Sequence, residues 1–467
     1  MPAFRKAWKE TYNAYSQKKM KTSEKIYSRL PVFLQHAACS LKGFMINHRR
    51  YDSEFFRFLN NYENNAVDAE KELRKFMRGI AGMDYYSRLF AEHGVDISFR
   101  NVYAEIAKLP VLSKEEVKKN TSAFINPEFK GKTITAHTSG TTGGGLVFPV
   151  AEEAEHKQWA VWWRYRRRHG IGFNTWCGWF GGKQIIFGRA EPPLYRINRA
   201  ARQIMFSAYH LREETAEHYY SVIRERKLEW LHGYPSQLSI LSALCVRRGL
   251  APVECVKIIT FGSENLEDWQ KSRIKEMFPR AVLRQHYGLA EMAANISENE
   301  NGILIPDNDF AYMEFLPIDG SRNLCRIIGT NFSNPAFPLV RYDTGDIAEV
   351  EWREGKPLIK KLDGRKEDFL RLPDGRIIGR LGQIFLKLPE AAEAQVVQKT
   401  ERDIEVRIVK MPSYTDETEK KLAAMLNERF DGELNIKIKY CDKITRTASG
   451  KLRMVVSEIN AFDGKRK

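Results

Sequence analysis

Between residues 184 and 285, short apolar segments alternate with longer segments of helical pattern, and this alternation limits the fold more than any other feature. The apolar segments are 184–187, 230–232, 256–261 and 281–285. Repeated strand-then-helix units predict a layered α/β domain with a largely parallel sheet. Because ligands bind at the carboxyl ends of parallel strands, the residues that follow these segments are candidate site residues.

The pattern changes near residue 365. Ile404, Val406 and Ile408 are apolar at every second position, as are residues 436, 438 and 440, and a helix that begins near Thr415 lies between these two segments. We therefore predict two domains, a large α/β domain at 1–364 and a small α+β domain at 365–467. A chain of 467 residues is long enough for at least two cores.

The charge of the chain is strongly basic and unevenly distributed. The net charge is +16, and the first fifty residues hold eleven lysines and arginines but only two glutamates. A second cluster consists of Arg164, Arg166, Arg167 and Arg168. Runs of basic residues usually form solvent-exposed faces, and binding to acidic lipid headgroups is the more specific alternative. No nucleic-acid-binding signature accompanies them, so nucleic acid is not expected as a partner.

Cysteine spacing and hydropathy bear on the compartment. The six cysteines form no Cys-x-x-Cys pair and no zinc-type cluster with histidine, which predicts reduced thiols and no soft-ligand metal site. No signal peptide is found, and no apolar stretch approaches the roughly 20 residues that span a bilayer. We expect a cytoplasmic protein, either free or peripheral to the inner face of the membrane.

A loop of hydroxyl residues and glycines begins at Thr138 and ends at Gly145. It precedes the strand-like run 146–150 and contains Thr138, Ser139, Gly140, Thr141, Thr142 and Gly143. Such a backbone can turn its N–H groups inward around a polyphosphate. Taken alone, a loop of this composition is more often a flexible connector, and it is not a Walker A sequence.

Polar motifs follow this loop in a fixed order. They are Gly-Tyr-Pro-Ser at 233–236, Gly-Ser-Glu at 262–264, Tyr-Gly-Leu-Ala-Glu at 287–291, Arg-Tyr-Asp-Thr-Gly-Asp at 341–346, Asp-Gly-Arg-Lys-Glu-Asp at 363–368 and Arg-Thr-Ala-Ser-Gly-Lys at 446–451. In this order the motifs resemble the adenylate-forming superfamily of acyl-CoA synthetases, adenylation domains and luciferases. Residues 85–90, 108–110, 233–235 and 446–453 further resemble the phenylacetate-CoA ligase group, especially its CapK-like capsular-polysaccharide branch.

The resemblance implies a reaction. The family activates a carboxylic acid with ATP, releases pyrophosphate, and transfers the acyl group of the resulting acyl-AMP to a nucleophile. Capsule or surface polysaccharide biosynthesis is a candidate context. ATP and Mg²⁺ are the implied cofactors, and CoA is one candidate acceptor beside an amine, a sugar hydroxyl and a carrier thiol.

Residue roles follow from the same resemblance. The loop residues at 138–143 would hold the β- and γ-phosphates, Glu291 would bind Mg²⁺, and Lys451 would act in catalysis together with Thr142 and Glu291. The nucleotide would contact Gly262, Ser263, Glu264, His286, Tyr287 and Gly288, with Tyr287 against adenine and with Asp346 and Arg365 at the ribose. His232, Tyr234 and Trp179 are candidates for the acyl pocket. The C-terminal domain would rotate about Lys366 and Glu367.

Several alternatives stay open at this point. His232 is equally well a core histidine, and the stripe Trp159, Trp162 and Trp163 is expected in the core rather than in a substrate platform. Residues 369–376 read as a Pro-Asp-Gly hairpin turn, which weakens CoA as the acceptor. The hypotheses are therefore an adenylating ligase with another acceptor, an aryl- or acyl-CoA ligase, and a non-catalytic membrane-surface or glycan-binding protein. The acid and the oligomeric state are not predicted.

Overall fold

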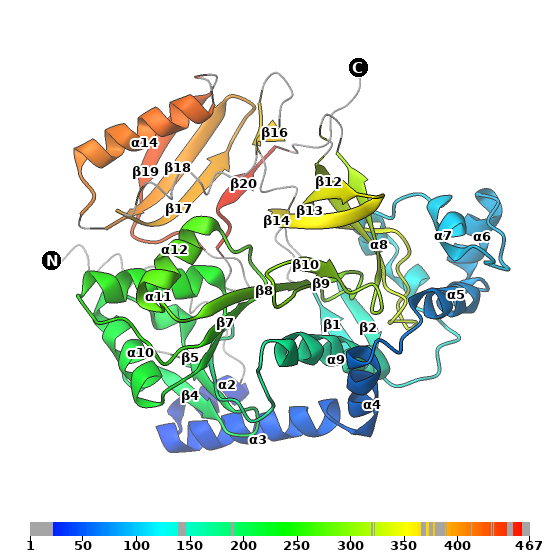
Figure 1. Ribbon diagram of the computed structural model, residues 1–467, viewed down its shortest axis with the longest axis horizontal. Coiled ribbons are helices and arrows are strands. Elements are labelled where there is room, and N and C mark those ends of the chain that lie inside the picture. Colours follow the sequence, from blue (N-terminus) through cyan, green and yellow to red (C-terminus); the bar gives the residue numbers. More distant parts are fainter. Residues whose placement is uncertain are drawn as a thin grey trace.

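The computed structural model describes most of the chain (Figure 1). The described residues are 22–138, 146–187, 191–318, 321, 323–365, 370–372, 377–378, 388, 390–411, 413–430, 432, 434–445 and 452–459. The helices are α2 (Thr22–Arg29), α3 (Val32–Arg50), α4 (Ser53–Glu63), α5 (Ala69–Ile80), α6 (Asp84–Glu92), α7 (Val102–Ala107), α8 (Lys114–Lys119), η1 (Thr121–Phe124), α9 (Glu152–Arg168), η2 (Ala208–His210), α10 (Glu213–Glu225), α11 (Pro235–Arg247), α12 (Asp268–Met277) and α14 (Asp416–Arg429).

The strands of the N-terminal part form a small pair and one large mixed sheet. They are β1 (Thr133–His137), β2 (Val147–Ala151), β3 (Cys177–Phe180), β4 (Tyr195–Asn198), β5 (Gln203–Phe206), β6 (Trp230–Gly233), β7 (Ile258–Phe261), β8 (Val282–Gly288), β9 (Asn295–Glu298), β10 (Leu304–Pro306), β11 (Tyr312–Pro317), β12 (Leu324–Thr330), β13 (Tyr342–Arg353) and β14 (Lys356–Arg365). In the described residues the large sheet has the order β11-β12-β13-β14-β10-β9-β8-β7-β6-β3-β5-β4.

Only the centre of the large sheet is parallel. Strands β5, β3, β6, β7 and β8 run parallel, whereas β9 to β14 pair antiparallel beyond β8. The predicted strands at 230–232, 256–261 and 281–285 are present with small shifts. The strand predicted at 184–187 is absent, and this is a correction. Ile185 and Ile186 there pack beside Met205 and Trp179 without joining a ladder.

Helices cover both faces of the parallel strands. Helices α10, α11 and α12 pack on one face, where Leu231 of β6 is fully buried among them. Trp230, the preceding residue, belongs to the core on the opposite face, which α4 to α7 and α9 complete. Side chains of a strand alternate between faces, so successive residues of β6 serve two separate cores. Figure 1 shows α9 on the side of the sheet away from α10 to α12.

Local sequence signals fix several helix starts. Asp52 and Asp68 accept hydrogen bonds from the backbone N–H groups of Phe55 and Lys71, each at 3.0 Å, at the starts of α4 and α5. Ser113 caps α8 by accepting from the N–H of Glu116 at 3.1 Å. The Glu116 carboxylate accepts from the Tyr85 hydroxyl at 2.7 Å and so joins α8 to α6.

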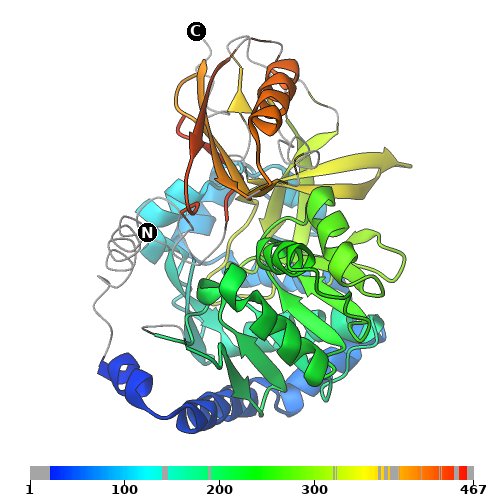
Figure 2. The ribbon, with the colours of Figure 1, turned by 90° about the vertical axis from the view of Figure 1, so that its left-hand side faces the viewer.

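The C-terminal part holds its own sheet and core. Strands β17 (Ala391–Gln398), β18 (Asp403–Lys410), β19 (Asn435–Tyr440) and β20 (Val455–Ser457) pair in the order β19-β18-β17-β20, with α14 packed against them. A short antiparallel pair, β15 (Leu370–Arg371) and β16 (Ile377–Ile378), precedes this sheet. Both ribbon views place this part next to α11 and α12 and far from α3 (Figures 1 and 2). The division of the chain at 364 and 365 stays a prediction.

Within the described ranges, no helix has the length and apolar character that crossing a bilayer requires.

Candidate active site

A cavity of about 1010 Å³ lies at the carboxyl ends of the parallel strands, beside α3 and α9. Its wall brings together residues from segments that are far apart in the sequence. Eight residues predicted for the site line it, namely Thr138, Trp179, His232, Gly262, Ser263, His286, Gly288 and Glu291. The carboxyl ends of β3, β6, β7 and β8 supply most of them, as expected for a parallel sheet. The structure therefore joins the predicted acyl-pocket and nucleotide residues in one wall.

Several predicted residues cannot be placed. Ser139, Gly140, Thr141, Thr142 and Gly143 lie outside the described residues, as do Lys366, Glu367 and Lys451. For Arg365 the structure describes the backbone alone, which pairs with Asp346 across β13 and β14.

Tyr287 and Asp346 form a direct contact beside the cavity. The Tyr287 hydroxyl donates to Asp346 Oδ2 at 2.7 Å, and the Asp346 side chain is 8% exposed. The Thr344 hydroxyl also accepts the N–H of Asp346 at 3.1 Å, which fixes this turn of the backbone. Two motifs separated by more than fifty residues thus meet, as their predicted roles at adenine and ribose require.

Glu291 lies buried between two partners. Its Oε1 accepts from the Lys114 ammonium at 3.0 Å and from the Tyr342 hydroxyl at 3.1 Å. Lys114 was not predicted as a site residue, because in the sequence it follows a helix cap and has the composition of an exposed first turn. Only the tertiary fold brings α8 against the end of β8.

Glu264 connects the two parts of the chain. Its Oε2 accepts from the N–H of Ser236 at 3.2 Å, and its Oε1 accepts from the N–H of Leu452 at 2.9 Å. Leu452 directly follows the predicted catalytic residue Lys451 in the sequence. The Gly-Ser-Glu motif therefore accepts a hydrogen bond from the backbone of the C-terminal segment.

Two histidines form a neutral pair in the cavity wall. The rings of His232 and His286 stack with centroids 6.1 Å apart, and His232 Nδ1 lies 2.9 Å from the hydroxyl of Thr260. Burial and the positive charge of Arg166 lower the pKa of His286 to about 3 and hold the pKa of His232 well below its usual value. His232 is thus both a hydrogen-bonded buried histidine and a lining residue, so the two interpretations of it hold together.

Comparison with known proteins agrees with this geometry. Residues 370–458 match the family model described as the CapK C-terminal domain. Over 450 residues the chain is 25% identical to protein CapK of Staphylococcus aureus, covering 93% of this chain and 99% of that protein. The chain is a homologue of CapK. It is also 23% identical to the phenylacetate-coenzyme A ligase of Pseudomonas putida over 310 residues, which cover 61% of this chain and 66% of that protein.

Solved structures give the fold. A 2-hydroxyisobutyryl-CoA ligase, in complex with R3-HIB-AMP in the postadenylation state, matches with a TM-score of 0.63 at 15% identity, covering 84% of this chain and 90% of that one. The same ligase in complex with 2-HIB-AMP matches with a TM-score of 0.62 at 16% identity over the same shares. The predicted fold class and the predicted resemblance are therefore confirmed. Fold and relatives together indicate an adenylate-forming ligase.

For this CapK homologue, the role of Tyr234 in an acyl pocket stays a prediction, since Tyr234 precedes α11 in an extended conformation and is not among the residues that line this cavity. Two other expectations need correction. Trp159, Trp162 and Trp163 all line the cavity, and Trp159 and Trp163 also contribute to the core, because α9 lies between the core and the open space. Arg166 and its neighbour Arg164 do not belong to a solvated face, since they are 9% and 4% exposed, while Arg167 and Arg168 are exposed.

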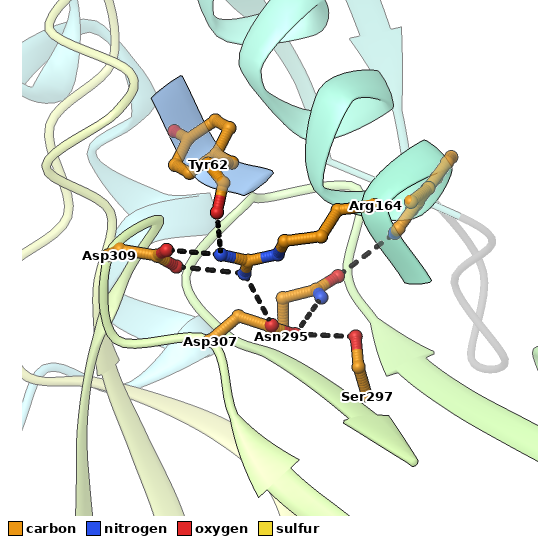
Figure 3. Close-up of polar contacts among 7 residues, drawn as sticks. Tyr62, Arg164, Asn295, Ser297, Asp307 and Asp309 are labelled. Carbon is orange, nitrogen blue, oxygen red and sulfur yellow. Dashed lines mark hydrogen bonds and ion pairs between the residues drawn. The ribbon is translucent and has the colours of Figure 1, made fainter. Parts of the chain in front are cut away.

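Arg164 organises a buried polar network behind the wall (Figure 3). Its guanidinium donates to Asp307 Oδ1 at 2.7 Å, to Asp309 and to the backbone carbonyl of Tyr62 at 3.2 Å. Asp307 Oδ2 in turn accepts from Asn295 at 2.6 Å and from Ser297 at 2.7 Å. The Trp162 indole donates to Asn295 Oδ1 at 2.9 Å, so the network fixes the orientation of a wall residue.

Proposed function

We propose that this chain is an ATP-dependent ligase that activates a carboxylic acid as acyl-AMP with release of pyrophosphate and then transfers the acyl group to a nucleophile. The supporting observation is the convergence of three separate motifs on one cavity, through Thr138, Gly262 and Glu291. A carboxylate is a poor acyl donor, so the site must hold two anions together and stabilise charge on phosphorus. In this role ATP contacts Tyr287 and Asp346, and the carboxylate enters from the cavity.

Glu291 is the proposed contact for Mg²⁺. Within the described residues no cluster of three histidine, cysteine or acidic side chains is able to enclose a metal. This fits Mg²⁺, which binds through one or two carboxylates and substrate phosphates rather than in a protein cage. Both hydrogen bonds that the described residues make to the Glu291 side chain use Oε1, which leaves Oε2 for the cation. When bound, Mg²⁺ supplies positive charge to the phosphate oxygens.

Lys451 is the proposed cation for the first half-reaction. The contact of Leu452 with Glu264 supports this role, because a lysine one residue away from that contact starts within reach of the cavity edge. Rotation of the C-terminal part about Lys366 and Glu367 would then withdraw Lys451 before acyl transfer.

The acceptor separates two candidate functions. The antiparallel pairing of Leu370–Arg371 with Ile377–Ile378 on either side of residues 373–376 supports a hairpin at this point and favours an acceptor other than CoA. A relative that is named as a coenzyme A ligase favours thioester formation instead. We propose an amine, sugar hydroxyl or carrier thiol in surface polysaccharide synthesis as the first candidate and CoA as the second.

Carboxylate-dependent exchange of labelled pyrophosphate into ATP tests the proposal. We expect exchange with at least one acid from a panel of uronic, aromatic, dicarboxylic and amino acids. Lys451→Ala should abolish most of the exchange and should slow acyl transfer from preformed acyl-AMP much less. Equal loss in both half-reactions would contradict the role of Lys451, and product masses with and without CoA identify the acceptor.

We further propose that α2 and α3 contact an anionic membrane surface. The amphipathic pattern of helix α3 is the reverse of the usual one, because its polar side chains face the protein. His36 Nδ1 accepts from the N–H of Ile197 at 3.2 Å, and Asn47 donates to the carbonyl of Ala200 at 2.8 Å. Exposed apolar residues on the two helices are Ile26, Phe33, Leu34, Leu41, Phe44 and Met45.

Basic residues surround this apolar surface. Lys25, Arg29, Lys42 and Arg49 are exposed on the same two helices, where Glu24 is the one acidic residue. Apolar insertion combined with basic charge is the usual recognition mode for acidic headgroups. Figure 2 places both helices at the end of the molecule opposite the C-terminal part, so the contact would leave that part free to move.

Vesicle sedimentation tests the membrane contact. We expect binding to vesicles of phosphatidylcholine and phosphatidylglycerol, and at least about tenfold weaker binding for Phe33→Ser/Phe44→Ser, because burying each ring in the membrane contributes up to about 1.5–3 kcal/mol. Ile97→Ser/Ile303→Ser, which changes exposed apolar residues elsewhere, is the matched control. Equal binding by both double variants, or self-association in place of vesicle binding, would refute the contact.

A further inference from the structure

One arginine in the cavity wall is buried among aromatic rings. The Arg166 guanidinium lies over the rings of Trp163, Trp159 and Trp230, at 5.0, 5.4 and 5.5 Å from their centroids, and the side chain is 9% exposed. It lines the cavity beside His232 and His286. Cation–π contacts with three indoles partly compensate for lost hydration, and no side chain of the described residues accepts a hydrogen bond from this guanidinium.

No carboxylate of the described residues pairs with this cation. The groups that act on its charge are the neutral side chains of Tyr51, Cys177 and Tyr165 and the positive charge of Arg50. Arg164, two residues earlier on the same helix, differs in having two aspartates (Figure 3).

The whole wall is short of negative charge. Among the described residues, the cavity is lined by one carboxylate, Glu291, against the cations Arg50, Lys114, Arg166, Lys183, Arg199 and Arg202. Arg50 and Lys114 have acidic partners in Glu155 and Glu291, whereas no acidic group in the described part of the chain pairs with Arg166. Arginine does not lose its proton in proteins, so burying it without a partner costs several kcal/mol. A protein retains such a residue when a ligand supplies the anion.

We infer that the acid activated by this site carries a second anionic group, a carboxylate or a phosphate, which pairs with Arg166 at the base of the cavity. This inference rests on the proposed adenylating function and adds a substrate class to it. The reacting carboxyl group stays near Glu291 and Thr138, and the second anion occupies the tryptophan-lined end. Planar bidentate pairing with a guanidinium suits both a carboxylate and a phosphate.

Matched acids test the inference in the pyrophosphate assay. Glutarate is compared with pentanoate, and 3-phosphoglycerate with glycerate, so each pair differs in one terminal anion. We expect kcat/KM at least about tenfold higher for the dianionic member of one pair, and that pair identifies the anion. Arg166→Met should bring this ratio close to one, and Arg166→Lys should retain part of the preference.

Arg168→Met, on the exposed side of the same helix, is the control and should keep the preference of the wild type. Equal loss of activity with both members of a pair in Arg166→Met would overturn the inference, because Arg166 would then serve the reacting carboxyl group or the fold. So would a wild-type preference for the monoanionic acids.

A binding readout separates this inference from the proposed function. If none of the four acids releases pyrophosphate, the melting temperature is measured with and without glutarate and 3-phosphoglycerate. A rise in the wild type that Arg166→Met loses supports the anion subsite even where adenylation fails. No rise in the wild type with either dianion overturns it.

Discussion

At the scale of single residues, the candidate site holds buried polar groups with short hydrogen bonds. Asp346 is an example, because it accepts from the Tyr287 hydroxyl and its own N–H donates to Thr344 in a tight turn. We propose that Asp346 binds the nucleotide, and substitution separates this role from a structural one.

Asp346→Ala should weaken ATP binding without unfolding the chain. We expect the KM for ATP to rise by at least about tenfold, since a charged hydrogen-bond acceptor contributes about 1.5–3 kcal/mol. The melting temperature should fall by only a few degrees, as the Tyr287 hydroxyl lies in a part-buried position. Tyr287→Phe, which removes only the hydroxyl, is the control. A collapsed melting temperature in Asp346→Ala would favour a turn residue with no nucleotide contact.

His286 should make the free energy of unfolding depend on pH. Its pKa is lowered to about 3 in the folded state by burial and Arg166, against an ordinary value near 6.5 in the unfolded chain. The unfolded state therefore binds the extra proton between these values, and stability falls as the pH drops from 6.5 toward 3, by about 1.4 kcal/mol per pH unit.

Urea unfolding of the wild type and of His286→Gln between pH 4 and 8 measures this dependence. The wild type should lose free energy of unfolding more steeply below pH 6.5, and the two slopes should agree above pH 7. Parallel curves over the whole range would show that His286 is not held neutral.

At the scale of elements, helix α9 supplies both Arg164, which organises the buried polar network, and Arg166, which lines the cavity. Arg164 joins α9 to the loop after β10, and Trp162 joins it to β9 through Asn295. The glycine at 288 belongs to the same arrangement, because a Cβ there would lie 2.8 Å from Asn295 Oδ1. The orientation of α9 against the sheet is therefore fixed by buried hydrogen bonds as well as by apolar packing.

Arg164→Met should destabilise the chain by about 3–5 kcal/mol, because it leaves Asp307 buried without its cation. Burial already raises the pKa of Asp307 against the opposing effect of Arg164, so the variant should bind a proton there on folding. Arg164→Met/Asp307→Asn should recover part of the loss in urea unfolding. Arg167→Met, whose partner Glu63 lies at the surface, should cost less than about 1 kcal/mol. An equal loss of unfolding free energy in Arg164→Met and Arg167→Met would show that the buried network adds no more stability than a surface ion pair.

At the scale of the whole molecule, the two parts of the chain meet at Glu264. The bond from the N–H of Leu452 ties the end of the chain to the loop after β7, and Arg247 of α11 contacts Met411 nearby. Single contacts of this kind suit an arrangement that forms and separates during a catalytic cycle.

Glu264→Ala should slow adenylation by about tenfold, because it removes one charged acceptor for the C-terminal segment. Transfer from preformed acyl-AMP should be affected less, since it does not need that arrangement. Pyrophosphate exchange and single-turnover transfer measure the two steps. Glu276→Ala, an exposed acidic residue on α12, is the control. Losses of equal size in both steps would place Glu264 in the nucleotide site rather than at the contact between the parts.

The central strands and the residues proposed to contact the nucleotide could be predicted from the amino-acid sequence alone, for a local reason. Polar motifs such as 262–264 and 287–291 directly follow apolar strands, and parallel strands bring their carboxyl ends to one edge. The same reasoning mistook 184–187 for a strand, because apolar residues without a ladder partner have the same pattern.

The part of the cavity that we propose binds the acid depends on tertiary contacts that the sequence pattern does not show. Arg164 and Arg166 are two residues apart and so point about 200° apart around α9, and no one-sided helical pattern buries both. Both are buried because α4 and the loop after β10 cover one side of α9 while Trp230 of the sheet covers the other. These long-range neighbours decide that Arg164 pairs with aspartates and that Arg166 faces the cavity. The order of charges along the sequence does not reveal these neighbours.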